Sequence, residues 1–150
     1  MPLPQPPFTG RCLCGAIQIS VTAPPLLTLA CHCRDCQKLC ASAFSLTTMF
    51  PAEAFFLTGD LIIGGRGHGA RQHFFCKSCL NFVYSRIGSA SSRINLRTSL
   101  LDAAADFAPF VELMTNEKLP WVTLPVAHRF AEYPMDQTVL QALMSDFAAR

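Results

Sequence analysis

The stretch Cys31-His32-Cys33-Arg34-Asp35-Cys36 places three cysteines in the spacing C-x-C-x-x-C. Thiolates at contact distance repel one another, so such a group needs a cation between its sulfurs, and zinc is the commonest metal ion with sulfur ligands. If residues 31–33 are extended, Cys31 and Cys33 point to one face and His32 to the other. A turn through the C-x-x-C step then brings Cys36 to the same point. Three ligands leave a tetrahedral zinc one position short, which is typical of a chemical site, whereas structural zinc sites have four protein ligands.

Cys40 is the candidate for a fourth ligand. It follows Cys36 by four residues, one helical turn on, so its thiol could close the coordination shell. That arrangement would make the zinc structural and would remove the reason to expect chemistry. In the other interpretation, which we prefer, Cys40 is a buried thiol that packs as a small hydrophobic side chain.

Four further cysteines form two distant pairs, Cys12/Cys14 and Cys76/Cys79, with 61 residues between the pairs. Two such pairs make a four-thiolate site when strands bring them together. The site would join the first strand of the chain to the middle of a sheet. It would act as a staple, because the binding free energy of a structural zinc contributes to folding.

Composition narrows the class of protein. Of 150 residues, 51% are hydrophobic and 15% charged, which is typical of one ordered globular domain with a sizeable core. No apolar run is long enough to span a membrane, and the beginning of the chain lacks the basic region of a signal peptide. We therefore expect a cytoplasmic protein whose eight cysteines bind metal rather than form disulfides. The formal charge of +2 disappears once these cysteines count as zinc thiolates, so it indicates no nucleic-acid partner.

The hydrophobic pattern predicts a mainly β fold. Alternating or short apolar runs bounded by Gly and Pro predict strands at 16–22, 26–30, 44–50, 61–63, 72–75, 82–86 and 92–96. A helical turn is expected over 37–41. Asp136 caps a final helix whose apolar face consists of Val139, Leu140, Leu143, Met144 and Phe147. We expect a flexible, Pro-rich tail over 1–9 and a single domain over 10–150, with Trp121 and the twelve phenylalanines in its core.

The cysteine pattern resembles that of the glutathione-dependent formaldehyde-activating enzyme family, also called the Gfa or centromere-protein-V family. The resemblance covers about residues 10–133. It is carried by Gly10-x-Cys12-x-Cys14-Gly15, Cys31-His32-Cys33-x-x-Cys36-x-Lys38, Ser42-Ala43-Phe44 and Phe74-x-Cys76-x-x-Cys79, with weaker matches at Leu101-Asp102 and Pro120-Trp121. Two positions depart from the family pattern: Leu80 follows the last C-x-x-C in place of the usual Gly, and Cys40 stands where a Gly is common.

The resemblance implies a β-tent (Mss4-like) fold of small antiparallel sheets around zinc, with a short C-terminal helix. It implies two zinc ions per chain: a structural zinc on Cys12, Cys14, Cys76 and Cys79, and a catalytic zinc on Cys31, Cys33 and Cys36. The implied activity is the addition of glutathione to formaldehyde, which gives S-(hydroxymethyl)glutathione and is classed as a carbon–sulfur lyase reaction. The partner is then a small-molecule thiol, with neither nucleic acid nor membrane involved.

Two alternatives to a zinc enzyme are a non-catalytic, zinc-structured binding module, favoured if Cys40 closes the second site, and a disulfide-rich secreted domain. The missing signal peptide and the C-x-C spacing, whose cysteines rarely pair with each other, argue against the secreted domain.

The remaining polar motifs are expected to be structural or peripheral. We assign a structural or solvent-facing role to each of His32, His68, His73 and His128. The glycine-rich segment 64–69 is followed by no helix, so a hairpin connection is expected in place of a phosphate loop. Such a connection could cover a ligand, and Arg66 and Arg71 would then meet the carboxylates of glutathione.

Overall fold

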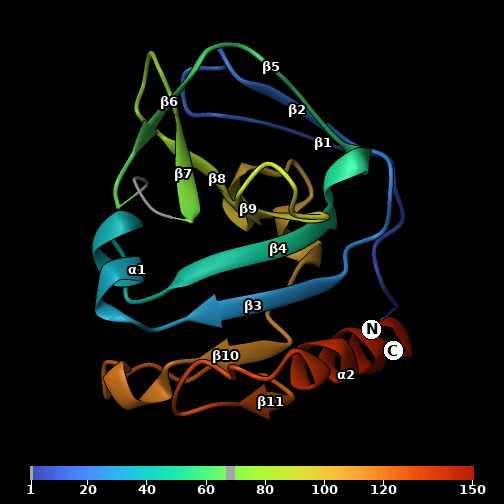
Figure 1. Ribbon diagram of the computed structural model, residues 1–150, viewed down its shortest axis with the longest axis vertical. Helices are drawn as coiled ribbons and strands as arrows, with labels where there is room; N and C mark the ends of the chain where they lie inside the picture. The colour runs from blue at the N-terminus through green and yellow to red at the C-terminus, as the bar shows by residue number, and fades with distance from the viewer. Residues whose placement is uncertain (1, 67–69) are drawn as a thin grey trace.

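Two sheets form the frame of the protein (Figure 1). The computed structural model describes residues 2–66 and 70–150, so His68 lies outside the described residues. A three-stranded antiparallel sheet has the order β1-β2-β5, with β1 at Phe8–Arg11, β2 at Gln18–Val21 and β5 at Phe55–Thr58.

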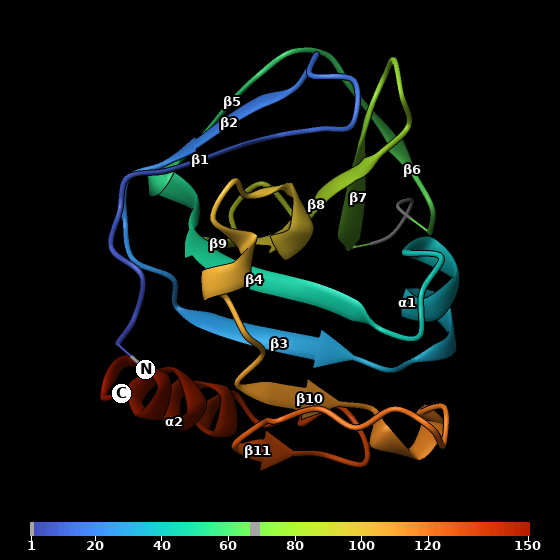
Figure 2. The ribbon, with the colours of Figure 1, turned by 180° about the vertical axis from the view of Figure 1, so that it is seen from behind.

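The larger sheet has eight strands in the order β11-β10-β3-β4-β9-β8-β7-β6. Their bounds are β3 Leu27–Cys31, β4 Ser45–Pro51, β6 Leu61–Gly64, β7 Arg71–Cys76, β8 Phe82–Ile87, β9 Arg93–Arg97, β10 Val111–Leu113 and β11 His128–Arg129. Strand β10 runs parallel to β3 and to β11, and the other neighbours are antiparallel. Helix α1 (Arg34–Leu39) lies at one end of β3 and β4, as both views show (Figures 1 and 2). No helix among the described residues is long and apolar enough to cross a membrane.

One hydrophobic core lies between the two sheets. Ile19 and Val21 of β2 are buried, as their alternation with polar residues predicts, and Phe50 and Leu96 of the larger sheet belong to the same cluster. Phe8 also packs here, with its ring centroid 5.9 Å from that of Phe50. Strand β1 therefore begins at Phe8, within the tail expected over residues 1–9, and its aromatic side chain belongs to the core.

The second core lies between the larger sheet and helix α2 (Gln137–Ala148). Asp136 caps this helix as predicted, since its carboxylate accepts a hydrogen bond from the Thr138 amide at 2.9 Å. Leu143 and Phe147 are buried and the other apolar residues of the expected face are half-buried against the same cluster. Helix α2 is the C-terminal element of the chain, and the N-terminus of the chain lies beside it in space (Figure 2).

The mainly β, β-tent fold with a short C-terminal helix is confirmed, but four strands were missed. Strand β10 has the sequence Val111-Glu112-Leu113 and is fully buried, and a charged central residue gives no strand signal. Strands β1, β5 and β11 are only two to four residues long. The prediction that Trp121 and all phenylalanines lie in the core is wrong, since Trp121 is 73% exposed and Phe56 is 55% exposed.

Candidate metal centres

The first cysteine cluster is assembled from two turns. Cys12 and Cys14 follow β1, Cys76 ends β7, and Cys79 lies in the turn before β8. All four sulfurs lie within 4.8 Å of one another, and the Cys12–Cys14 and Cys14–Cys76 sulfur pairs are 3.7 and 3.8 Å apart. A tetrahedral zinc with Zn–S bonds of about 2.3 Å requires sulfur–sulfur edges of about 3.8 Å. This donor set therefore fits a zinc ion, and none of the eight cysteines is in a disulfide.

Backbone amides support the sulfurs of this first cluster. The Ile17 amide donates to Cys12 Sγ at 3.3 Å, and the Cys79 amide donates to Cys76 Sγ at 3.5 Å. Burial opposes ionisation of Cys12, but the Ile17 amide and the neighbouring cysteines lower the pKa of its thiol to about 6. Hydrogen bonds to the charged form are what a metal thiolate requires.

Leu80 occupies a position in this cluster's turn that normally requires glycine. Its φ is 59°, in the left-handed region, and its amide donates to the Cys76 carbonyl at 2.9 Å. The turn at the C-x-x-C step is thus retained despite the change from Gly, at the steric cost of a side chain with positive φ.

The second cysteine cluster comes from one continuous stretch. Cys31 ends β3, Cys33 caps the N-terminus of α1, and Cys36 lies in the first turn of that helix. Helix α1 begins at Arg34, three residues earlier than expected, because Cys33 Sγ accepts a hydrogen bond from the Cys36 amide at 3.3 Å. The three sulfurs lie within 4.8 Å of one another, so this donor set also fits a zinc ion.

The thiols of the second cluster share their protons unequally. A hydrogen bond from Cys31 lowers the pKa of Cys36 to about 5, with smaller contributions from Ser45, Cys33 and the Arg97 charge. The same interaction raises the pKa of Cys31. The cluster therefore favours a thiolate at Cys36 over one at Cys31, and a divalent cation bound there would favour the ionised form of all three.

Cys40 stands apart from this cluster. Across the described ranges, no fourth His, Cys, Asp or Glu ligand atom joins the group formed by Cys31, Cys33 and Cys36. Burial raises the pKa of the Cys40 thiol, although the charge of Arg97 opposes this. Our interpretation of Cys40 as a packed thiol stays a prediction. Ala41, the next residue, has φ 46° and closes α1, with the Ser42 amide donating to the Gln37 carbonyl at 3.1 Å.

A cavity of about 560 Å³ opens beside the second cluster. Its floor is one face of the larger sheet, because strand register aligns Cys31 with Ser45, Thr47 with Arg97 and Ser85 with Asn95. Its wall includes Cys36 and Leu39 of α1 and Cys40, which follows the helix, together with Arg66, Arg71, His73, Phe82 and Tyr133. The volume lies within the range of small-molecule sites, about 300–1,000 Å³.

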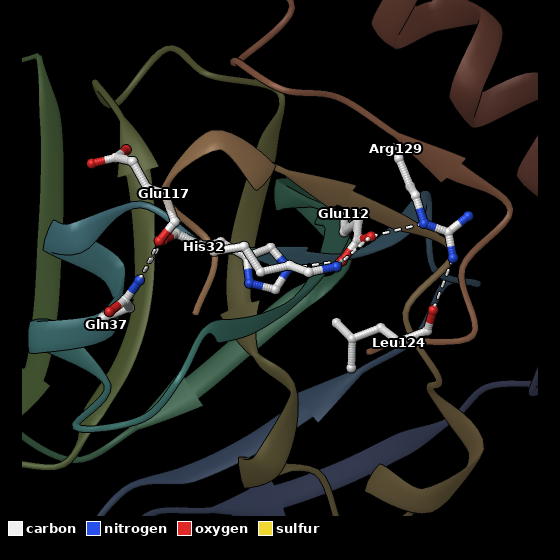
Figure 3. A network of polar contacts seen from close by, with 7 residues as sticks. His32, Gln37, Glu112, Glu117, Leu124 and Arg129 are labelled. Atoms are coloured by element: carbon white, nitrogen blue, oxygen red, sulfur yellow. Dashed lines mark hydrogen bonds and ion pairs between the residues drawn. The ribbon is translucent and has the colours of Figure 1, made fainter. Parts of the chain in front are cut away.

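His32 points away from the sulfurs, as the extended geometry predicts, and enters a buried ionic network (Figure 3). Its Nε2 lies 2.8 Å from Oε2 of Glu112 on β10, and both side chains are fully buried. Glu112 also accepts from Lys118 at 3.3 Å and from Arg129 at 2.9 Å. Gln37 Nε2 donates to the His32 carbonyl at 2.7 Å. These contacts fix the stretch that carries the second cluster.

Burial opposes the charge of Glu112, yet His32 and Lys118 hold the pKa of its carboxyl below the ordinary value.

The other predicted residues divide between the cavity and the surface. His73 lines the cavity, and burial lowers its pKa, whereas His128 pairs with Asp146 of α2 at 2.6 Å. Arg66 is exposed and pairs with Asp35. Sequence reasoning missed Glu112 and Arg97. Arg97 ends β9, one residue beyond the strand expected over 92–96, and lines the cavity.

Comparison with known proteins agrees with this architecture. The model of the family described as glutathione-dependent formaldehyde-activating enzyme matches residues 7–117, so the chain belongs to this family. A crystal structure of a Rhodobacter sphaeroides protein is similar, with TM-score 0.50 and 19% sequence identity over 63% of this chain and 87% of that one. At this identity the likeness shows the fold alone. The search of curated proteins found no match.

Proposed function

We propose that this protein is a zinc-dependent enzyme that acts on a thiol–aldehyde adduct. The reaction is the formation of S-(hydroxymethyl)glutathione from glutathione and formaldehyde, or its reversal, in the carbon–sulfur lyase class. The observation that carries the proposal is a three-thiol cluster on the wall of a 560 Å³ cavity, in a chain of this family.

The two clusters take different roles in this proposal. Cys12, Cys14, Cys76 and Cys79 hold a structural zinc, and Cys31, Cys33 and Cys36 hold the catalytic zinc. A zinc ion bound at the second cluster supplies Lewis-acid activation of a substrate thiol and lowers its pKa. A tetrahedral zinc on these three cysteines would have one position for a substrate thiol, since the described chain adds no fourth ligand atom there.

The residues around the cavity contribute position and charge. Apolar side chains such as Leu29, Met49 and Leu113 reduce water around the reacting groups, which strengthens electrostatic interactions inside the cavity. Arg97 is buried and its positive charge favours anionic sulfur at Cys36. Holding thiol and aldehyde together in this space converts a bimolecular addition into a step within one complex.

The experiment is exchange spectroscopy by NMR on mixtures of glutathione and formaldehyde. Zinc-loaded protein is expected to accelerate exchange between the free thiol and its adduct beyond the spontaneous rate. Cys36→Ser should reduce the rate to the spontaneous one while retaining the metal of the first cluster, and Cys40→Ala should keep the acceleration. An unaccelerated exchange, or an equal rate with Cys36→Ser, would contradict the proposal and favour the non-catalytic binding module.

A further inference from the structure

Buried polar atoms without a hydrogen-bond partner gather around the cavity. Of five such side-chain atoms in the described part of the chain, four belong to residues of the cavity lining: Ser45 Oγ, which has only the Cys36 sulfur beside it, His73 Nδ1, Asn95 Oδ1 and Arg97 Nε. Buried polar groups are normally paired, because an unpaired one retains its cost of desolvation. Their concentration at one cavity indicates that this cavity accepts a polar ligand rather than an apolar one.

Arg97 is the charged member of this group. The residue is 8% exposed, and Nη2 of its guanidinium donates to the Asn95 carbonyl at 3.3 Å, with the Cys40 thiol also close to the group. The guanidinium carbon lies 4.6 Å from the centre of the Phe82 ring, so one face of the group is covered. The Nε edge has no acceptor among the residues that the structure describes. Since arginine keeps its proton in proteins, this site carries a buried positive charge.

No carboxylate of the described chain is paired with the positive charge of Arg97. The one acidic residue of the lining, Asp35, pairs with exposed Arg66. The nearby Cys36 and Cys40 thiols offer single sulfur atoms, whereas the planar N–H fork of arginine matches the two oxygens of a carboxylate.

We propose that Arg97 is the anion anchor of this cavity, and that the cavity takes a small thiol that also carries a carboxylate. The carboxylate accepts hydrogen bonds from the free edge of the Arg97 guanidinium. Only the thiol end of this ligand rests on the proposed function. Arg97 then binds the ligand carboxylate, the role expected of Arg66 and Arg71 from the sequence.

The test uses two probes that have a carboxylate but no free thiol, S-methylglutathione and 3-(methylthio)propionate. Each is compared with the methyl ester in which every carboxylate is blocked, so S-methylglutathione is compared with its dimethyl ester. Binding to the zinc-loaded protein is measured by isothermal titration calorimetry. At least one acid should bind, and its ester should bind at least about tenfold more weakly, because a charge-assisted pair of hydrogen bonds is lost. Arg97→Gln should weaken the acid by a similar factor and leave the ester unchanged. Arg93→Gln, on the same strand but outside the cavity lining, is the matched control and should change neither.

Three results would overturn the proposal. The first is that neither acid binds, or that ester and acid bind equally. The second is that Arg71→Gln or Arg66→Gln removes the preference for the acid while Arg97→Gln retains it. The third is that Arg97→Gln loses metal from the second cluster but keeps its affinity for the acid, which would assign Arg97 to the metal. If Arg97→Gln does not fold, the same affinities are measured for Arg97→Lys, and the difference between acid and ester is measured on the unaltered protein.

The anchor and the proposed function can fail separately. If the acids bind through Arg97 but thiol–adduct exchange is not accelerated, the anchor stands and the enzyme proposal falls. If exchange is accelerated but Arg97→Gln changes neither probe affinity nor the KM for glutathione, the anchor falls and the enzyme proposal stands.

Discussion

The two cysteine clusters offer the same type of ligand, a thiol, but they differ in the number of sulfurs and in how far apart their cysteines lie in the sequence. The first takes four sulfurs from two turns that are far apart in the sequence, and two of its members, Cys12 and Cys76, belong to the core between the sheets. The second takes three sulfurs from one short stretch and borders a cavity. A metal ion bound at the first cluster would therefore hold distant parts of the fold together, whereas one bound at the second would depend on little of the fold and could keep a position for a ligand.

The largest expected difference between the clusters is in folding. Cys76→Ser should remove the metal of the first cluster and leave the protein largely unfolded at 25 °C, because structural zinc contributes about 10–16 kcal/mol in small domains and total stabilities are about 5–15 kcal/mol. Cys36→Ser should lose only the second metal and keep its cooperative unfolding transition. Circular dichroism and metal analysis check both variants. Similar unfolding of the two variants would contradict the division into structural and ligand-binding clusters.

A second difference is expected from the network behind the second cluster. Glu112→Gln leaves His32, Lys118 and Arg129 without their anion, so it should lower the free energy of unfolding by about 3 kcal/mol. It should also weaken metal binding at the second cluster more than at the first. Denaturant titration and a chelator competition measure these effects. The control, Glu53→Gln, alters an exposed side chain and should stay within about 0.5 kcal/mol.

The same variant gives a prediction on pH. The pKa of Glu112 is lowered in the folded protein, so its contribution is present above the ordinary carboxyl pKa of 4.5 and is lost as pH falls through the lower folded value. The stability difference between the unaltered protein and Glu112→Gln should therefore shrink as pH falls below about 4.5. A difference that grows as pH falls below about 4.5 would show that the network does not favour the ionised carboxylate.

Replacement of Cys40 tests whether the second cluster is open. Cys40→Ala should keep both metals and cost about 1 kcal/mol of stability, since it deletes one partly buried sulfur. Loss of one metal per chain on chelator challenge would identify Cys40 as a ligand and make the two clusters alike. Metal analysis after dialysis against a weak chelator gives the answer.

The smallest effects concern the turns that follow each cluster. Leu80 at the first and Ala41 at the second both have positive φ, where glycine has no steric cost. Leu80→Gly and Ala41→Gly should each raise the free energy of unfolding by about 0.5–1 kcal/mol, and both side chains are exposed, so little packing is lost. Thermal unfolding checks the direction. A lowered midpoint for either variant would show that its side chain contributes more than the backbone strain costs.

The sequence predicted the features that depend on local spacing. The spacing of the cysteines predicted both clusters, and the alternation of apolar and polar residues predicted β2 and β9. The capping residue Asp136 marked the start of α2. Features that depend on distant partners could not be predicted. Glu112 is buried because His32, Lys118 and Arg129 converge on it, and Arg97 is buried because α1 and neighbouring strands enclose a cavity above its face of the sheet. Neither set of neighbours is visible in the residues that flank these positions.

If the two clusters differ as proposed, the second keeps a coordination position for a thiol and the first does not. The direct measurement is the visible absorption spectrum of the Co²⁺-substituted protein during titration with glutathione. We expect a saturable change in the ligand-field bands of one of two Co²⁺ ions per chain, which is absent in Cys36→Ser and retained in Cys40→Ala. A spectrum that glutathione leaves unchanged, together with loss of one Co²⁺ in Cys40→Ala, would show two closed sites and contradict the claim.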